Sequence, residues 1–221
     1  MCNNIILIGF MGSGKTTIGR ELAQKLGQIL IDTDSLIEIN YGMKISDFFK
    51  RFDEAKFREI EKNLCIWCEK NLGNAIISTG GGMPTIYNMR NMGKVIFLDT
   101  PFNEIKKRIL NDGVENRPMI KDIDSMLKLY NNRLQIYKDM AHFSIDTLDY
   151  KENIVDKIYH YLKGWKLRAI LSVSDKTNIV FFAKELISLG YDILSTGGTL
   201  AYLQKHNINA IDISKYTDSK E

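Results

Sequence analysis

The sequence predicts an α/β fold built on a parallel sheet, followed by a second, smaller α/β segment. Residues 5–8, Ile-Ile-Leu-Ile, form a run rich in β-branched residues without polar alternation, as in a strand buried on both faces. A glycine-rich loop follows this run directly. Apolar runs then alternate with helix-period stretches along the rest of the 221 residues. We expect two domains, at residues 1–163 and 164–221.

Composition and charge exclude several classes of protein. A hydrophobic fraction of 44% and a charged fraction of 26% are typical of a globular protein and argue against a disordered or fibrous chain. The net charge of +3 indicates neither a nucleic-acid partner nor a membrane surface. The apolar run near the start is too short to span a bilayer and follows no Lys or Arg, so we expect a cytoplasmic protein without a signal peptide. Three cysteines, an odd number, argue against a disulfide framework.

The first strand leads into a phosphate-binding motif. Residues 9–16, Gly-Phe-Met-Gly-Ser-Gly-Lys-Thr, match the P-loop pattern G-x-x-x-x-G-K-[ST], and a helical stretch ending near Gly27 follows. Backbone N–H groups of such a loop surround a phosphate, Lys15 reaches the β- and γ-phosphates, and the Thr16 hydroxyl ligates Mg²⁺. The alternative is a glycine-rich turn with an exposed lysine. The motif predicts nucleoside triphosphate binding by Gly12, Ser13, Gly14, Lys15, Thr16 and Thr17.

A pair of carboxylates follows the second predicted strand, at residues 29–31. Asp32 and Asp34 lie at the carboxyl end of this strand, which is where ligands bind in open α/β sheets. We expect Asp32 to hold Mg²⁺, directly or through water, and Asp34 to point to the same rim. The alternative for Asp34 is an N-cap, because a helical pattern begins there.

Two helical stretches, at residues 45–52 and 54–70, carry Phe49, Phe57 and Arg58. Taken alone, such aromatic residues fit a core, and such an arginine fits a solvated face. A further strand at residues 75–79 runs into Gly80, Gly81 and Gly82. Three consecutive glycines are costly in conformational entropy, so we expect them where backbone contacts a ligand.

The remainder of the first domain continues the alternation. A strand at 95–98 and a helix at 102–110 lead to a polar segment, 111–121, whose Arg117 suggests a lid that closes over a transferring phosphate. The alternative is an exposed loop arginine. Arg133 and Tyr137 lie four residues apart on one face of the next helix. A strand near 142–147 and a helix at 151–163 complete the domain, and the single C-x-x-C at Cys65 and Cys68 lacks a second ligand pair for zinc.

In order and spacing, these elements resemble the shikimate kinase family over residues 5–162. The resemblance rests on residues 9–17, the Asp-Thr-Asp at 32–34, Phe-Arg at 57–58 with Glu61, Ser-Thr-Gly-Gly-Gly at 78–82, Asn-Arg-Pro at 116–118, and Arg133, Tyr137 and Ala141. It implies a P-loop fold of nucleoside monophosphate kinase type with a five-stranded parallel sheet and flanking helices. It also implies ATP-dependent phosphorylation of the shikimate 3-hydroxyl, in the aromatic amino acid precursor pathway, with Mg²⁺ as cofactor. A monomeric kinase domain without nucleic-acid or membrane partners is expected.

The resemblance also implies roles for individual residues. Arg58 and Arg133 would bind the substrate carboxylate, a task that suits a bidentate guanidinium. Asp34 would bind ring hydroxyls and accept a proton. The backbone N–H groups of Gly80 and Gly81 would face the substrate, with Gly82 beside them, and Phe49 and Phe57 would line the pocket for its ring. Arg108 would pack on the adenine, and Arg117 would reach the phosphate from the lid. The sequence departs from the family at Asp53, where glycine is frequent, and at Met83-Pro84.

The second segment, residues 164–221, is predicted to have the element order βαβαβ. We expect strands at 167–173, 191–194 and 208–213, a helix at 176–189 capped by Ser174 and Asp175, a loop at 195–199, and a helix at 200–206. Residues 168–177 and 194–199 are similar to the start of the bifunctional IMP cyclohydrolase/AICAR transformylase, a methylglyoxal-synthase-like domain. That implies contacts from Lys176 and residues 195–199 to a nucleotide phosphate. Only part of such a domain is present, so we expect no catalysis from it; a truncated fusion, a gene-model artefact and a docking appendage all remain open.

Two other functions compete with the shikimate kinase interpretation. One is a different small-molecule kinase of similar architecture, such as a gluconate kinase, which leaves Arg58 and Arg133 without a paired role. The other is a nucleotide-binding regulatory module without turnover. Intact Lys15, Asp34 and Arg117 argue against it.

Overall fold

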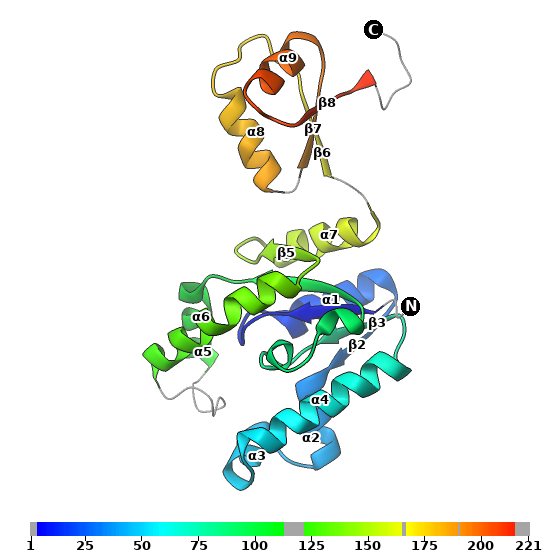
Figure 1. The fold of residues 1–221 in the computed structure, drawn as a ribbon, viewed down its shortest axis with the longest axis vertical. Helices are drawn as coiled ribbons and strands as arrows, with labels where there is room; N and C mark the ends of the chain where they lie inside the picture. The colour runs from blue at the N-terminus through cyan, green and yellow to red at the C-terminus, as the bar shows by residue number, and fades with distance from the viewer. Residues whose placement is uncertain (1–3, 113–121, 165–166, 190, 215–221) are drawn as a thin grey trace. The chain divides into compact units, whose positions relative to one another are not determined.

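The computed structural model describes residues 4–112, 122–164, 167–189 and 191–214 (Figure 1). The chain forms two compact units, residues 1–159 and 160–221. Within the described ranges, no helix is both long enough and apolar enough to cross a membrane.

The N-terminal unit is built on the five-stranded parallel sheet that the sequence resemblance implied. Its strands are β1 (Ile5–Ile8), β2 (Ile29–Asp32), β3 (Ala75–Ser78), β4 (Lys94–Asp99) and β5 (Phe143–Asp146). They pair in the order β2-β3-β1-β4-β5, and every pair is parallel. Residues of the central strands are buried throughout, as expected for a sheet covered on both faces.

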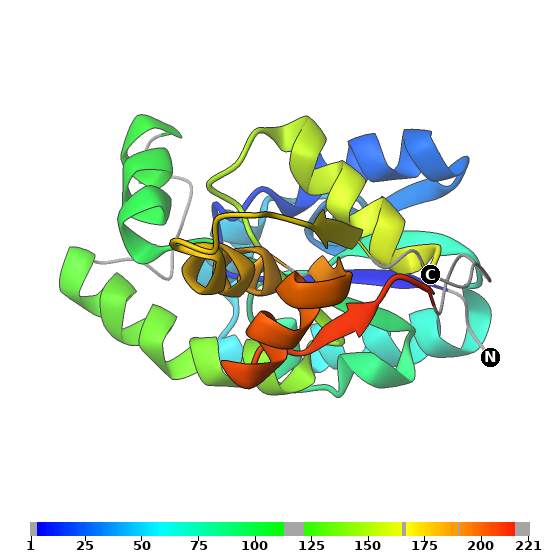
Figure 2. The same cartoon turned by 90° about the horizontal axis from the view of Figure 1, so that it is seen from above.

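Helices cover both faces of this sheet (Figures 1 and 2). On one face, α1 (Lys15–Leu26) packs against β2 and β3, and α7 (Lys151–Leu162) lies beside it, joined by an ion pair from Lys151 to Glu21. On the other face, α4 (Glu54–Asn71) and α6 (Ile123–Met140) bury side chains in one hydrophobic cluster with β1 and β4. The remaining elements are α2 (Thr33–Tyr41), α3 (Ile45–Arg51), α5 (Phe102–Asp112) and two 3₁₀ turns, η1 (Met83–Thr85) and η2 (Met89–Asn91).

The strand register brings the functional segments to one edge. Leu7 of β1 and Asp32 of β2 both lie level with Ser78 of β3. The P-loop follows β1, α2 follows β2, and the three glycines follow β3. These segments therefore converge at the carboxyl ends of the strands, where open α/β sheets bind ligands.

Cys65 and Cys68 lie in the hydrophobic cluster on α4. Both side chains are fully buried, and burial raises the pKa of Cys65 to about 12 and that of Cys68 to about 11. The described ranges contain no group of three or more His, Cys, Asp or Glu side chains placed to hold a metal ion. These cysteines therefore act as small apolar core residues.

The C-terminal unit carries a separate three-stranded parallel sheet. Its strands β6 (Leu167–Leu171), β7 (Tyr191–Ser195) and β8 (Ala210–Asp212) pair in that order. Helices α8 (Ile179–Ser188) and α9 (Gly197–Lys205) bury Ile179, Ala183 and Leu203 in its own hydrophobic cluster. The unit therefore has a core independent of the first sheet.

Two sequence expectations for this unit are wrong in detail. Helix α8 begins at Ile179, after Asn178 in a left-handed conformation (φ 60°), and Asp175 instead accepts hydrogen bonds from the N–H and hydroxyl of Thr177. Residues 195–199 are not a loop, because β7 includes Ser195 and α9 begins at Gly197.

Two hydroxyl groups expected to contact a phosphate are engaged within the unit. The Ser195 hydroxyl donates to the Leu171 carbonyl (2.6 Å), and the Thr199 hydroxyl donates to the Val173 carbonyl (3.0 Å). Ser195 is fully buried and Thr199 is 5% exposed. These side chains tie β7 and α9 to the end of β6.

Asn4 joins three segments of the N-terminal unit. Its side-chain amide donates to the carbonyls of Leu72 (3.0 Å) and Met92 (3.1 Å) and accepts from the N–H of Ala75 (3.0 Å). The residue is 1% exposed, so all three partners depend on this one side chain.

Substitution Asn4→Ala leaves these buried backbone groups without partners. We expect it to lower the free energy of unfolding by about 2–4 kcal/mol, measured by urea denaturation. The control is Asn40→Ala, which removes one exposed side-chain bond within α2 and should change stability by less than about 0.5 kcal/mol. Equal effects of the two substitutions would contradict the structural role of Asn4.

Candidate active site

A cleft of about 1110 Å³ opens at the carboxyl ends of the strands. Nearly every site residue expected from the sequence lines it. These residues are Gly12, Ser13, Gly14, Lys15, Thr16, Thr17, Asp32, Asp34, Phe49, Phe57, Arg58, Gly80, Gly81, Gly82, Arg108 and Arg133. The remaining one, Arg117, lies outside the described residues.

The P-loop forms one wall of the cleft. Gly12 (φ 76°) and Gly14 (φ 89°) have left-handed backbone conformations that a side chain disfavours. Gly14 also caps α1, so the positive end of this helix faces the cleft. The ammonium of Lys15 donates to the carbonyls of Gly9 and Phe10, both at 2.9 Å. The lysine therefore lies along the loop with its charge at the cleft wall.

Asp32 has two tasks, one for each carboxylate oxygen. Its Oδ1 accepts the N–H of Ser35 (3.1 Å) and caps α2, while its Oδ2 accepts the hydroxyl of Thr16 (2.6 Å). The N-cap of α2 is thus Asp32, and the alternative that Asp34 caps this helix is wrong. Burial alone would raise the pKa of Asp32, but the bonds from Thr16 and Ser35 outweigh it and hold that pKa below its usual value.

The oxygens around Asp32 suit a magnesium ion bound together with a nucleotide. The Ser78 hydroxyl lies 3.3 Å from that of Thr16, so one carboxylate and two hydroxyl oxygens gather beside the P-loop. All three side chains line the cleft. Mg²⁺ prefers oxygen ligands and is usually held by one or two carboxylates plus phosphates and water, which matches this sparse donor set.

Asp34 lies in the first turn of α2 and faces the glycines that follow β3. A Cβ atom placed on Gly80 would lie 2.6 Å from its Oδ1, so the carboxylate packs directly on the backbone there. Burial, reinforced by the neighbouring charge of Asp32, raises the pKa of Asp34 to about 6. A carboxylate with a raised pKa is a stronger base than an exposed one.

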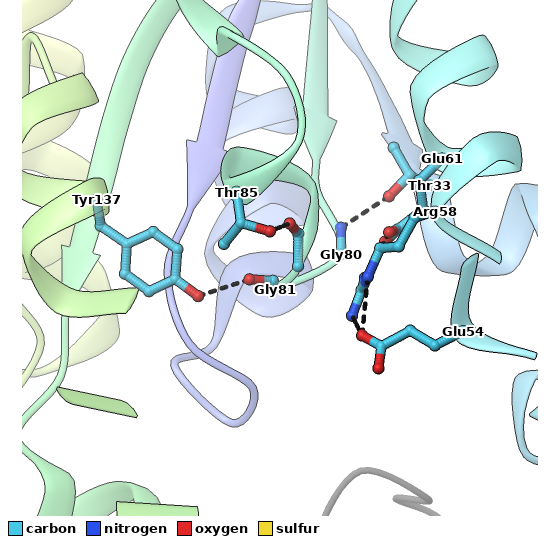
Figure 3. Close-up of polar contacts among 9 residues, drawn as sticks. Thr33, Glu54, Arg58, Glu61, Gly80, Gly81, Thr85 and Tyr137 are labelled. Carbon is cyan, nitrogen blue, oxygen red and sulfur yellow. Dashed lines mark hydrogen bonds and ion pairs between the residues drawn. The ribbon is translucent and has the colours of Figure 1, made fainter. Parts of the chain in front are cut away.

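Arg58 of α4 is held by two glutamates (Figure 3). Its guanidinium lies 2.5 Å from a carboxylate oxygen of Glu61 and 2.8 Å from one of Glu54. It also packs on Gly82, where an added Cβ would lie 2.0 Å from its Nη1. This close approach explains a glycine at that position by lack of space rather than by backbone conformation.

Arg133 of α6 is the second cation of the cleft and differs from Arg58 in its partners. It is 6% exposed, and it makes no ion pair with a carboxylate among the residues that the structure describes. A Cβ on Gly81 would lie 3.7 Å from its Nη1. One turn later on α6, the Tyr137 hydroxyl donates to the Gly81 carbonyl (2.6 Å).

Two further groups complete the walls. The rings of Phe49 and Phe57 lie 4.9 Å apart and form an apolar surface beside Arg58. At the opposite end, Arg108 pairs with Glu104 (2.9 Å) and donates to the Gly12 carbonyl (3.2 Å). Arg108 thus contacts the backbone of the P-loop, and its contact with a nucleotide stays a prediction.

One site residue, Thr33, was not predicted from the sequence, although it stands between Asp32 and Asp34 in the chain. Its hydroxyl accepts the N–H of Gly80 (2.9 Å), and the residue is fully buried. The Gly80 N–H that we expected to face substrate is therefore bonded to Thr33. A hydroxyl residue at a strand end, next to two ligand-facing carboxylates, is the signal that could have identified it.

Comparisons with known proteins agree with this geometry. The sequence model of the shikimate kinase family matches residues 11–163, and that of the MGS-like domain matches residues 178–221. A shikimate kinase from Helicobacter hepaticus is 47% identical over 143 residues, which cover 65% of this chain and 86% of that protein. One from Clostridium botulinum is 40% identical over 169 residues, covering 74% and 98% of the two chains.

Solved structures give the same assignment. Shikimate kinase from Acinetobacter baumannii, in complex with shikimate, aligns with a TM-score of 0.67 and 30% identity over 76% of this chain and 96% of that chain. Shikimate kinase from Bacteroides thetaiotaomicron aligns with a TM-score of 0.65 and 30% identity, covering 73% and 98%. The chain belongs to the shikimate kinase family and carries an MGS-like segment at its C-terminal end.

Proposed function

We propose that the N-terminal unit transfers the γ-phosphoryl group of ATP to the 3-hydroxyl of shikimate, giving shikimate 3-phosphate and ADP. The observation that carries this proposal is one cleft lined by a P-loop, by two guanidinium groups and by the half-buried carboxylate of Asp34. The relative from Acinetobacter baumannii that binds shikimate supports the choice of substrate. All these residues come from one chain, so the proposal requires no second copy.

The charges at the substrate end favour a small acid. Arg58 forms ion pairs with Glu54 and Glu61, whereas Arg133 is buried, forms no ion pair among the described residues, and interacts with Glu61 only from beyond ion-pair distance. A buried charge is costly unless it is paired. The carboxylate of shikimate would supply that partner, in the bidentate geometry that a guanidinium favours.

The chain's own groups would act mainly by positioning and by neutralising charge, which is how phosphoryl transfer is generally catalysed. Lys15 and the P-loop amides would hold the β- and γ-phosphates. Asp34 would orient the 3-hydroxyl and accept its proton as the oxygen attacks phosphorus. Arg108 would lie against the adenine, and Arg117, from residues outside the described ranges, would approach the transferring group.

We propose that Thr16 and Asp32 hold Mg²⁺, with Ser78 beside them. When bound with the nucleotide, the ion supplies positive charge to the phosphate oxygens. Asp32 suits this task because its pKa is depressed, which keeps the carboxylate ionised.

The reaction is tested by measuring ADP release from ATP and Mg²⁺ with shikimate, with gluconate, and without an acceptor. We expect rapid ADP release with shikimate alone. Equal rates with and without shikimate would contradict the proposal, and turnover of gluconate instead would favour a kinase of different specificity. ATP binding without any turnover would favour a regulatory module.

Substitution Arg133→Ala removes the buried cation that forms no ion pair with a carboxylate among the described residues. We expect weaker shikimate binding by about 2–5 kcal/mol, seen as a raised KM for shikimate and an unchanged KM for ATP. Arg20→Ala, on an exposed position of α1 outside the cleft, is the matched control and should change neither constant. A normal shikimate KM in Arg133→Ala would rule out the assigned role.

The domain boundary yields a further prediction. The Clostridium botulinum relative is matched over 98% of its length by only 74% of this chain, so that kinase has no counterpart of the C-terminal unit. We therefore propose that residues 1–163 form the kinase domain, and we expect truncation after residue 163 to leave kcat and the KM for shikimate unchanged. A large loss of kcat in a truncated protein with a normal circular dichroism spectrum would show that the C-terminal unit completes the site.

A further inference from the structure

Three hydroxyl groups hold the backbone of residues 80–82, called here the glycine turn (Figure 3). Thr33 accepts the Gly80 N–H at 2.9 Å, Tyr137 donates to the Gly81 carbonyl at 2.6 Å, and Thr85 donates to the Gly82 carbonyl at 2.7 Å. Each peptide of the turn is therefore fixed by a side chain.

The position of this turn determines where the substrate-facing side chains lie. A Cβ on Gly80 would lie 2.6 Å from Asp34, and a Cβ on Gly82 would lie 2.0 Å from Arg58. Asp34 and Arg58 therefore pack directly against the backbone of the turn, and a side chain on Gly80 or Gly82 would collide with them. A shift of the turn by a few tenths of an ångström would move the surface against which the carboxylate and the guanidinium pack.

Tyr137 differs from the two threonines because it reaches the turn from another layer of the fold. Thr33 directly precedes Asp34, and Thr85 lies three residues beyond Gly82. Tyr137 lies on α6, one helical turn after Arg133, and its phenol oxygen also interacts with that arginine. It is 1% exposed, and burial raises its pKa to about 12, so the phenol stays protonated and can donate at neutral pH.

We propose that Tyr137 is a positioning residue for shikimate binding: its hydroxyl sets the spacing between Arg133 on α6 and the glycine turn. This inference rests on the proposed function. It assigns no contact between Tyr137 and substrate. The residue acts through the two groups that it joins, so its loss should affect the acid-binding end of the cleft more than the nucleotide end.

The same helix offers a matched control. Tyr130 is also buried on α6, and its hydroxyl donates to the Thr100 carbonyl (3.2 Å) away from the glycine turn. Neither tyrosine lines the cleft itself, so the two differ in the backbone carbonyl that each hydroxyl binds. Substitution to Phe at either position removes one buried hydroxyl from α6, so general effects on stability should be similar.

The experiment compares full-length Tyr137→Phe and Tyr130→Phe with the unsubstituted protein in steady-state assays that vary shikimate and ATP separately. We expect Tyr137→Phe to raise the KM for shikimate by about tenfold, the effect of one lost hydrogen bond of ordinary strength, while the KM for ATP stays unchanged. Tyr130→Phe should leave both KM values unchanged. Thermal unfolding of each variant reports the stability cost.

Equal shikimate KM values in the two variants would overturn the inference, as would a parallel rise of both KM values in Tyr137→Phe. If Tyr137→Phe does not fold, Tyr137→Met takes its place, because it also removes the hydroxyl that donates to Gly81 while its flexible apolar side chain fills the buried space. It should raise the KM for shikimate, and an unchanged value would overturn the inference. An unsubstituted protein without shikimate-dependent turnover would refute the proposed function itself, and the inference with it.

Discussion

The cleft depends on how charge is compensated among side chains that are buried or half-buried. The guanidinium groups of Arg58 and Arg133 and the carboxylates of Asp34 and Glu61 lie around the glycine turn. Each of these charges is costly to bury without a partner. Arg58 and Glu61 satisfy each other at 2.5 Å. Arg133 forms no ion pair with a carboxylate among the described residues. Burial raises the pKa of Asp34 to about 6. An anionic ligand with a hydroxyl group would complete this arrangement, which is why a small hydroxy acid fits it better than a neutral sugar.

The parallel sheet makes this concentration of charge feasible. Because Leu7, Ser78 and Asp32 lie at one level, at or next to the ends of their strands, the P-loop, the glycine turn and α2 begin side by side. The glycines then provide space: neither Gly80 nor Gly82 could carry a side chain without displacing Asp34 or Arg58. The P-loop and the glycine turn are therefore neighbouring backbone segments of one cleft wall.

The sequence was most informative where function depends on local pattern. A buried strand, a P-loop and a helix are contiguous, so the P-loop segment was predictable from pattern, whereas the five-stranded sheet was implied by the family resemblance. It was less informative where several segments meet. Residues 32–34 did not reveal that Asp32 caps α2 with one oxygen and bonds Thr16 with the other, or that Thr33 binds Gly80. The glycines were attributed to ligand contact, whereas their lack of side chains makes room for Asp34 and Arg58. The roles of individual site residues in catalysis stay predictions.

Calorimetric titration with shikimate and with its uncharged methyl ester addresses the compensation of charge without relying on turnover. The two ligands share the ring and its hydroxyls and differ in the negative charge that Arg133 and Arg58 would pair. Pairing worth about 2 kcal/mol or more corresponds to an affinity at least about 30-fold higher for the acid. Equal affinities for acid and ester would show that the buried guanidinium groups do not bind the carboxylate.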